Sequence, residues 1–173
     1  YLFTKNKIKD ASNAKFLLRI EDTDKERSKQ QYEDSILNGL NWLQINWDDE
    51  IIRQSENIET HIKYANTLIQ NGGAFKCICK PEDLINKIND YLAKGKNIKR
   101  LCNDCQNNEE IQSKKTDYCI RLKINNNEKT TSINDKVQGN IKINNEEIDN
   151  YIILRTDGTP TYMLSVVIDD HTM

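Results

Sequence analysis

The stretch over residues 16–27 places the strongest constraint on how this chain can fold. Its first five residues are apolar except for Arg19, and the run then breaks into carboxylates at Glu21 and Asp22. An apolar run of this kind is typical of a buried strand in a parallel sheet. Charged side chains at the carboxyl end of such a strand mark the edge where open α/β sheets bind their ligands. We therefore expect a strand over residues 15–21 with a ligand site at its end.

The same residues also fit a simpler interpretation, a strand-to-helix turn in which Asp24 caps the segment that follows. Glu21 and Asp22 occupy adjacent strand positions, so their side chains point to opposite faces of the sheet. At most one of them therefore faces a given pocket. Local spacing alone leaves both interpretations open.

Strand-like and helical patterns alternate up to about residue 75, as in a doubly wound sheet. Apolar residues at helical spacing predict one helix after Ser28, which forms a capping box with Gln31. They predict a second helix that Ser55 caps and Gly72 ends. His61 is a lone imidazole on this second helix, where a solvent-facing or packing role is favoured over ligation.

The pattern changes over 77–150, where a cysteine-bearing segment is followed by one helix over 81–93 and by short strands such as 118–124. The apolar runs at 151–154 and 162–170 are typical of strands, and we expect them to return to the first sheet. The predicted fold is therefore an incomplete α/β, Rossmann-type doubly wound parallel sheet that is interrupted by an inserted α+β domain.

The composition limits the classes of function open to the chain. Charged residues make up 30% and hydrophobic residues 36% of the 173 positions, which is polar but compatible with a packed core. A net charge of −2 gives no overall basic field, so any RNA contact would come from local patches. No apolar run approaches the roughly 18 residues of a membrane helix, and no leader is recognisable. We expect a soluble protein of the cytoplasm or of an organelle matrix.

Five cysteines is an odd number, which favours metal ligands or free thiols over a closed disulfide framework. Four of them form two close pairs, Cys77-x-Cys79 and Cys102-x2-Cys105, separated by 22 residues. Zinc takes four thiolate or imidazole ligands in a tetrahedron, and two short-range pairs supply them. The alternative is four unliganded thiols. Cys119 falls within a predicted strand and is most simply a core residue.

A basic run at 94–100 is a candidate for contact with RNA phosphates. A charged run on a solvated face is the simpler interpretation.

Several short segments resemble one family, in the same order along nearly the whole chain. Arg-Ile-Glu-Asp-Thr-Asp at 19–24 resembles the signature that follows the second strand in glutamyl-tRNA synthetases. A second match covers 154–162 and continues at 166–171, and similar sequences occur at 39–43 and 54–56. Because these matches are collinear, the resemblance is more specific than any single motif.

The resemblance implies a two-step reaction in which glutamate attacks the α-phosphate of ATP, with Mg²⁺, and the terminal ribose of tRNA then takes the acyl group. Glu21 matches the family residue that binds the α-amino group of glutamate, and Tyr162 matches a tyrosine that contacts the amino acid. Asp24 and Arg27 match positions near the tRNA acceptor end. We expect Glu21 and Tyr162 to face one amino-acid pocket; a core tyrosine on a strand is the alternative.

By the same resemblance, residues 1–75 and 151–173 belong to the catalytic nucleotide-binding fold, and 76–150 to an inserted domain that binds the tRNA acceptor. Many family members hold a structural zinc ion there, on ligands that begin with a Cys-x-Cys pair. This chain departs from their pattern because Asn107 stands where His is usual. We infer that Cys102 replaces the missing ligand.

The family's His-Ile-Gly-His and Lys-Met-Ser-Lys-Ser motifs do not occur in the sequence, and residues 1–8 resemble the tail of a helix. We therefore expect a partial chain of a ligase that is monomeric at full length and acts on tRNA-Glu, or on tRNA-Gln as well. The 173-residue polypeptide should not activate glutamate alone. ATP–pyrophosphate exchange above background would contradict this.

Four rival hypotheses remain at this point. A paralogue that glutamylates a modified base of tRNA-Asp has a shorter insertion than the long segment 105–150. Glutaminyl-tRNA synthetase generally lacks this zinc arrangement. A zinc-stabilised RNA-binding module would bind zinc and tRNA without binding glutamate, and a decayed gene fragment would not fold as a monomer.

Overall fold

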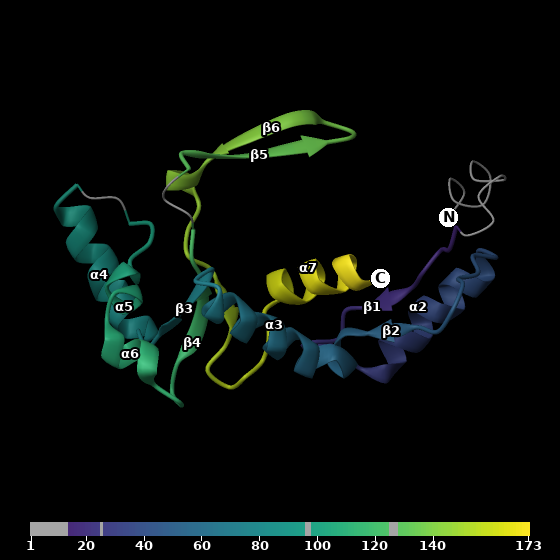
Figure 1. Ribbon diagram of the computed structural model, residues 1–173. Helices are drawn as coiled ribbons and strands as arrows, with labels where there is room; N and C mark the ends of the chain where they lie inside the picture. Colours follow the sequence, from purple (N-terminus) through teal and green to yellow (C-terminus); the bar gives the residue numbers. More distant parts are fainter. Residues whose placement is uncertain (1–13, 25, 96–97, 125–127) are drawn as a thin grey trace. The chain divides into compact units, whose positions relative to one another are not determined.

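The computed structural model describes residues 14–24, 26–95, 98–124 and 128–173 (Figure 1). The helix tail predicted at residues 1–8 lies outside these ranges.

The chain divides into two compact units, which are described separately. One runs to His61 and resumes at Ser165, and the other spans Ile62–Leu164. The domain boundaries expected at residues 75 and 150 stay a prediction.

The first unit contains a βαβ arrangement made of β1 (Arg19–Ile20), α2 (Gln30–Trp42) and β2 (Ile52–Arg53). The two strands pair in parallel. Parallel neighbours require a crossover connection, usually a helix, and α2 lies in that connection. This parallel pair agrees with the expected α/β class.

The strand predicted over residues 15–21 is wrong in extent, since only two residues of it form a strand. The carbonyls of Phe16 and Leu18 still accept hydrogen bonds, from the N–H groups of Asp48 (2.8 Å) and Ile52 (3.1 Å). None of the described residues of this run is buried. Among the described residues β1 has a single neighbouring strand, β2, so the run is half-covered where the sequence predicted full burial.

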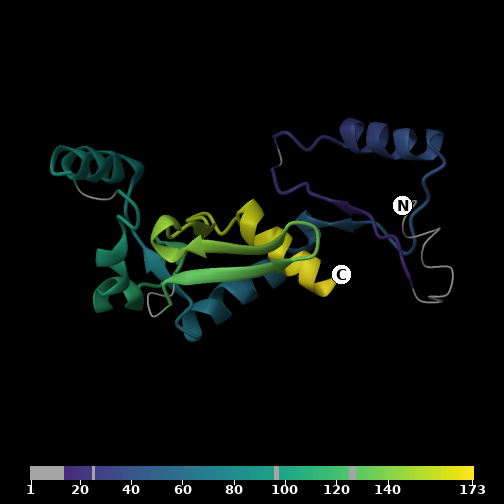
Figure 2. The same ribbon diagram turned by 90° about the horizontal axis from the view of Figure 1, so that it is seen from above.

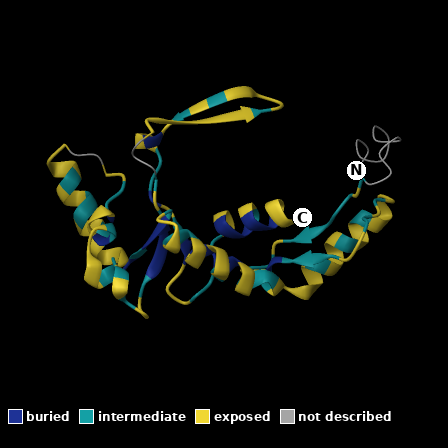
Figure 3. Ribbon diagram, in the orientation of Figure 1, coloured by how far each residue is buried: buried dark blue, intermediate teal, exposed yellow. Residues whose placement is uncertain are grey.

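Helix α2 has the predicted helical spacing of apolar residues, but that face is not buried. Tyr32 and Ile36 are 51% and 52% exposed, and none of the described residues of α2 is buried (Figure 3). The apolar pattern therefore predicted the helix correctly without predicting what covers it.

Both predicted serine caps are wrong. The N-cap residue of α2 is Lys29 and not Ser28. Ser55 lies inside a short 3₁₀ helix, η1 (Gln54–Asn57), which precedes α3 (Ile58–Gln70). Ser28 thus lies one residue before the N-cap of α2, and the 3₁₀ helix that contains Ser55 separates this serine from the body of α3.

A buried carboxylate brings the end of the chain into the first unit. Asp169 is 1% exposed and accepts hydrogen bonds from Gln54 Nε2 (3.0 Å), Asn57 Nδ2 (3.4 Å) and His61 Nε2 (2.9 Å). A carboxylate only accepts, so His61 must donate from Nε2. His61 is fully buried, which confirms the expected packing role.

The strand predicted at 162–170 is wrong, because these residues form helix α7 (Tyr162–Thr172). Valine and isoleucine favour strands, but a short apolar run does not by itself distinguish a strand from a helix. The exposure pattern shows helical spacing: Val167 is 67% exposed, while the buried positions are Leu164, Ser165, Ile168 and Asp169.

The second unit is built on an antiparallel sheet of three strands, β3 (Ala74–Cys77), β4 (Cys119–Leu122) and β7 (Ile152–Leu154). β4 is the central strand. β7 therefore pairs with β4, and not with the β1–β2 pair to which the sequence assigned it. Figure 3 shows the buried residues of this unit concentrated on these strands.

Short helices and a hairpin complete the second unit. The predicted helix over 81–93 is confirmed, and it begins at Pro81, a residue favoured in the first helical turn. Figure 2 shows the two strands of the hairpin side by side. These elements are α4 (Pro81–Ala93), α5 (Asn103–Gln106), α6 (Glu109–Ser113), β5 (Thr130–Asp135), β6 (Gly139–Asn144) and η2 (Asn145–Glu147).

Within the described residues, none of the helices has the length and apolar character needed to cross a bilayer.

Replacing Asp169 with Asn should destabilise the chain by about 1–3 kcal/mol, because the amide presents a donor to groups that themselves donate. The measurement is the free energy of unfolding in urea, followed by circular dichroism. Glu59→Gln, at an exposed position on α3, is the matched control and should change this free energy little. Equal stability of the two variants would mean that the buried carboxylate is not important for folding.

Candidate functional site

A cavity of about 480 Å³ opens at the carboxyl end of β1. Glu21, Asp22 and Arg27 line it, together with residues of α2 and with Arg53 of β2. The cavity lies at the sheet edge where the sequence predicted a ligand site. Three of the charged residues at and after the end of the predicted strand therefore line a single cavity.

Arg19 fixes the carboxylate of Glu21. Its Nη2 donates to Glu21 Oε1 at 3.1 Å, and its Nη1 donates to Asp170 Oδ1 at 2.5 Å. The Arg19 side chain is 15% exposed, whereas that of Glu21 is 40% exposed. Glu21 is thus a positioned anion that remains accessible from the cavity. Sequence reasoning missed this role of Arg19, although a cation inside an apolar run was the available signal.

Asp22 has a structural role. Its carboxylate accepts hydrogen bonds from the backbone N–H of Ser55 (2.8 Å) and from the Ser55 hydroxyl (2.6 Å). These bonds connect the end of β1 to η1. Of the two adjacent carboxylates, Glu21 is therefore the one available to a ligand, in line with the expectation that only one faces a given pocket.

Asp24 and Arg27 lie together, as an ion pair in which Arg27 Nε donates to Asp24 Oδ2 at 2.6 Å. The backbone N–H groups of Glu26 and Arg27 donate to Asp24 Oδ1. The hydrogen bond from the Arg27 side chain, followed by that from its backbone, holds the pKa of Asp24 below its usual range. The carboxylate thus organises the turn before α2, as the simpler interpretation expected.

Tyr162 is the first residue of α7 and is 60% exposed. It is therefore neither on a strand nor in the core, which excludes the alternative of a core tyrosine. Tyr162 falls in the second unit and Glu21 in the first. Their expected meeting across one pocket stays a prediction.

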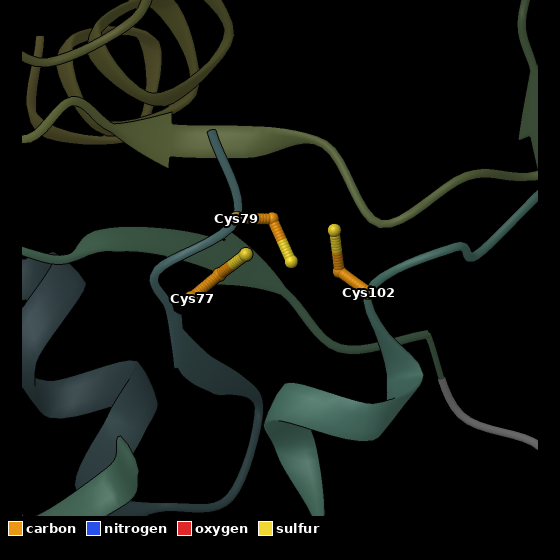
Figure 4. A group of neighbouring side chains, drawn as sticks. All are labelled: Cys77, Cys79 and Cys102. Carbon is orange, nitrogen blue, oxygen red and sulfur yellow. The ribbon is translucent and has the colours of Figure 1, made fainter. Parts of the chain in front are cut away.

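The cysteines of the two predicted pairs come together, and all five cysteines are free thiols. The sulfurs of Cys77, Cys79 and Cys102 lie within 4.8 Å of one another and point toward a common centre (Figure 4). Cys105 Sγ is 3.4 Å from Cys79 Sγ. Tetrahedral zinc–thiolate bonds place ligand sulfurs about 3.8 Å apart, so these separations fit a soft metal ion.

Hydrogen bonding and burial shift the acidity of these thiols in opposite directions. Hydrogen bonds with Cys102 and Cys119 hold the pKa of Cys77 well below its usual range. The same hydrogen bonds, together with burial, raise the pKa of Cys102 and of Cys119. Burial raises the pKa of Cys105 to about 12. A metal ion at this position would bind these sulfurs as thiolates, so binding would release their protons.

Arg121 places a buried positive charge beside this cluster. It is 9% exposed, and its Nη1 donates to the carbonyl of Asn150 at 2.8 Å. It also hydrogen-bonds to Cys77. Four thiolates leave a zinc site with a net negative charge, and a buried anion requires such a partner. Sequence reasoning missed Arg121, since nothing in its local sequence relates it to the cysteine pairs.

The basic run is partly occupied by contacts within the second unit. Lys99 Nζ donates to the carbonyl of Glu147 at 2.7 Å, and Arg100 Nε donates to the carbonyl of Ile148 at 3.2 Å. The backbone N–H of Arg100 donates to Asp149 Oδ1 at 2.8 Å. The end of this run therefore fixes the segment after β6.

The profile of the family described as tRNA synthetases class I (E and Q), catalytic domain, matches residues 2–173. The chain belongs to this family. The expected α/β, Rossmann-type class is confirmed with it.

The relatives of the chain are glutamate–tRNA ligases. Glutamate–tRNA ligase 2 of Ehrlichia chaffeensis is 45% identical over 162 residues, which cover 94% of this chain and 34% of the relative. Glutamate–tRNA ligase 1 of Orientia tsutsugamushi is 41% identical over 176 residues, which cover 100% of this chain and 36% of the relative.

A crystal structure of a glutamate tRNA ligase from Elizabethkingia meningosepticum, in complex with its amino acid, matches with a TM-score of 0.78 and 28% identity. The match covers 91% of this chain and 35% of that one. The chain thus spans about a third of the length of its relatives, which confirms the expected partial chain.

Arg27→Gln should raise the pKa of Asp24 toward the ordinary range of aspartate, because the variant loses the guanidinium. The folded-state pKa of Asp24 is lowered, so its contribution to stability is present at neutral pH and is lost as the pH falls through that pKa. The measurement is an NMR titration of the side-chain carboxyl groups.

Asp135 is the internal reference for this titration. The backbone N–H groups of Gln138 and Val137 lower the pKa of Asp135, and this pKa should be the same in the wild type and in the variant. An Asp24 titration that is the same with and without Arg27 would show that the ion pair does not form in solution.

Proposed function

We propose that this chain is the part of a glutamate–tRNA ligase that binds glutamate and the acceptor end of tRNA. The observation that carries the proposal is the fixed, accessible carboxylate of Glu21 in a cavity at the end of β1, in a chain of the synthetase family. The related structure that holds its amino acid supports glutamate as the ligand.

In this proposal Glu21 binds the α-ammonium group of glutamate. Arg19 orients the carboxylate from one side, which leaves its second oxygen to accept from the ligand. A charge-assisted hydrogen bond in a partly desolvated cavity is stronger than a neutral one. Tyr162, exposed at the start of α7, contacts the bound amino acid, and Asp24 with Arg27 forms the surface near the tRNA acceptor end.

The reaction proceeds in two steps. The side of the site that binds the amino acid presents the glutamate α-carboxylate to the α-phosphate of ATP, and pyrophosphate leaves as glutamyl-adenylate forms. A ribose hydroxyl of the tRNA then attacks the acyl carbon, and AMP leaves. ATP with Mg²⁺ supplies the activating phosphate. The contribution of this chain is positioning and charge, the main sources of catalysis in chemistry of this kind. tRNA-Glu is the proposed acceptor of a monomeric, cytoplasmic enzyme.

Glu21→Gln should lower kcat/KM for glutamate by about 10- to 150-fold in a full-length ligase that carries this segment, because it removes a charged hydrogen-bond partner worth about 1.5–3 kcal/mol. The measurement is glutamate-dependent ATP–pyrophosphate exchange. Glu26→Gln, an exposed position outside the cavity, is the matched control and should keep the wild-type value. Wild-type kinetics in the Glu21 variant would remove Glu21 from the proposed site.

We further propose that the cysteine cluster binds one structural Zn²⁺ through Cys77, Cys79, Cys102 and Cys105. The donor set fits, because all four are thiols that lie close together and three of them are buried. They lie in the core of the second unit, so a bound metal would connect β3 to α5.

Zinc should raise the thermal unfolding midpoint of the 173-residue chain, and a chelator should reverse the increase. A ligand at 100 times its Kd stabilises the folded state by about 2.7 kcal/mol. An equal concentration of Mg²⁺ is the control and should leave the midpoint unchanged, because Mg²⁺ prefers oxygen ligands. Identical midpoints with and without zinc would argue for four unliganded thiols.

A further inference from the structure

Five thiols meet in the core of the second unit, although a tetrahedral zinc ion takes four ligands. Four of the five cysteines form the buried core with Phe75, and Cys79 packs against it. The number of sulfurs therefore exceeds the number of metal ligands, which raises the question of what the fifth thiol does.

Three of the sulfurs form the centre of the cluster. Cys77, Cys79 and Cys102 are the only three among the described His, Cys, Asp and Glu residues whose ligand atoms all lie within 4.8 Å of one another. They come from β3, the segment after it and the residue before α5. These three are fixed members of any metal site here.

The remaining two sulfurs flank this centre through different neighbours. Cys105 Sγ lies 3.4 Å from Cys79 Sγ. Cys119 and Cys77 are direct cross-strand partners on β4 and β3, and both belong to the same buried cluster. Cys105 thus contacts one central ligand, and Cys119 is paired across the sheet with another.

We propose that Cys105 and Cys119 are alternative fourth ligands of the metal held by Cys77, Cys79 and Cys102. The proposal rests on the proposed zinc site and assigns a metal-binding role to Cys119, which the sequence assigned to the core. The thiol that is not bound keeps its proton and donates a hydrogen bond to its neighbouring ligand sulfur. The fourth ligand loses its proton to solvent when the metal binds.

The backbone around the two residues favours such an exchange. Cys105 lies on α5, a helix of four residues, whereas Cys119 lies on β4, between two paired strands. The two candidate ligands thus belong to different elements, so one can bind the metal without the other. Arg121, two residues after Cys119, offers its positive charge to whichever set of four thiolates forms.

The test measures Co²⁺ and Zn²⁺ binding to the 173-residue chain under reducing conditions. Co²⁺ absorption reports the number of thiolate ligands, and competition with a chelator reports Zn²⁺ affinity. Cys105→Ser should keep a spectrum of four thiolates and lose no more than about 10- to 100-fold in Zn²⁺ affinity, the cost of removing an outer hydrogen-bond partner. Cys119→Ala should behave in the same way. The double variant should lose the fourth thiolate signal and more than about 100-fold in affinity.

Cys102→Ser is the matched control, because it removes a central ligand. It should lose as much thiolate signal and Zn²⁺ affinity as the double variant. A three-thiolate spectrum in Cys105→Ser would overturn the proposal even if the Cys119 variants fail to fold. Loss of the fourth thiolate signal in Cys119→Ala, with Cys105 intact, would also overturn the proposal, since Cys119 would then be an obligatory ligand. Absence of metal binding by the wild-type chain would instead reject the zinc site itself.

Discussion

The carboxylate of Asp169 is the interaction on which the first unit depends. It accepts hydrogen bonds from Gln54, Asn57 and His61, which lie more than 100 positions earlier in the sequence. A buried anion is costly unless donors surround it, and these side chains supply them. The next residue, Asp170, binds Arg19, which in turn holds Glu21. One pair of adjacent aspartates thus joins the end of the chain to β1 and to the candidate glutamate site.

The second unit depends on sulfur in a similar way. Its buried cluster around Phe75 consists otherwise of four cysteines, so thiols occupy much of the space between β3, β4 and α5. Thiols pack as small apolar groups when they are neutral, and they bind metal when they lose their protons. A buried guanidinium at Arg121 offsets the negative charge that this second state brings. A core of this kind serves both for packing and for metal binding, which suits a small unit with limited apolar area.

The sequence predicted the grouping of polar residues after β1 better than it predicted the secondary structure around them. Glu21, Asp24 and Arg27 were identified through a short collinear signature, and the structure places two of them at one cavity and pairs the third with Arg27. The strand predicted at 15–21 was too long, because an apolar run does not show how many strands flank it. The strand predicted at 162–170 is a helix, because a short apolar run does not distinguish a strand from a helix. The serine caps failed because turns and a 3₁₀ helix compete with direct capping.

The sequence by itself determined the family, the α/β class, the helix over 81–93 and the grouping of the cysteines into two pairs, because these follow from local order and short spacing. Only the tertiary structure decided that Asp22 binds Ser55 while Glu21 stays accessible, that β7 pairs with β4, and that Cys119 and Arg121 border the thiol cluster. The physical reason is that these relations join positions far apart in the chain, and local periodicity does not encode which distant side chains will share a buried environment.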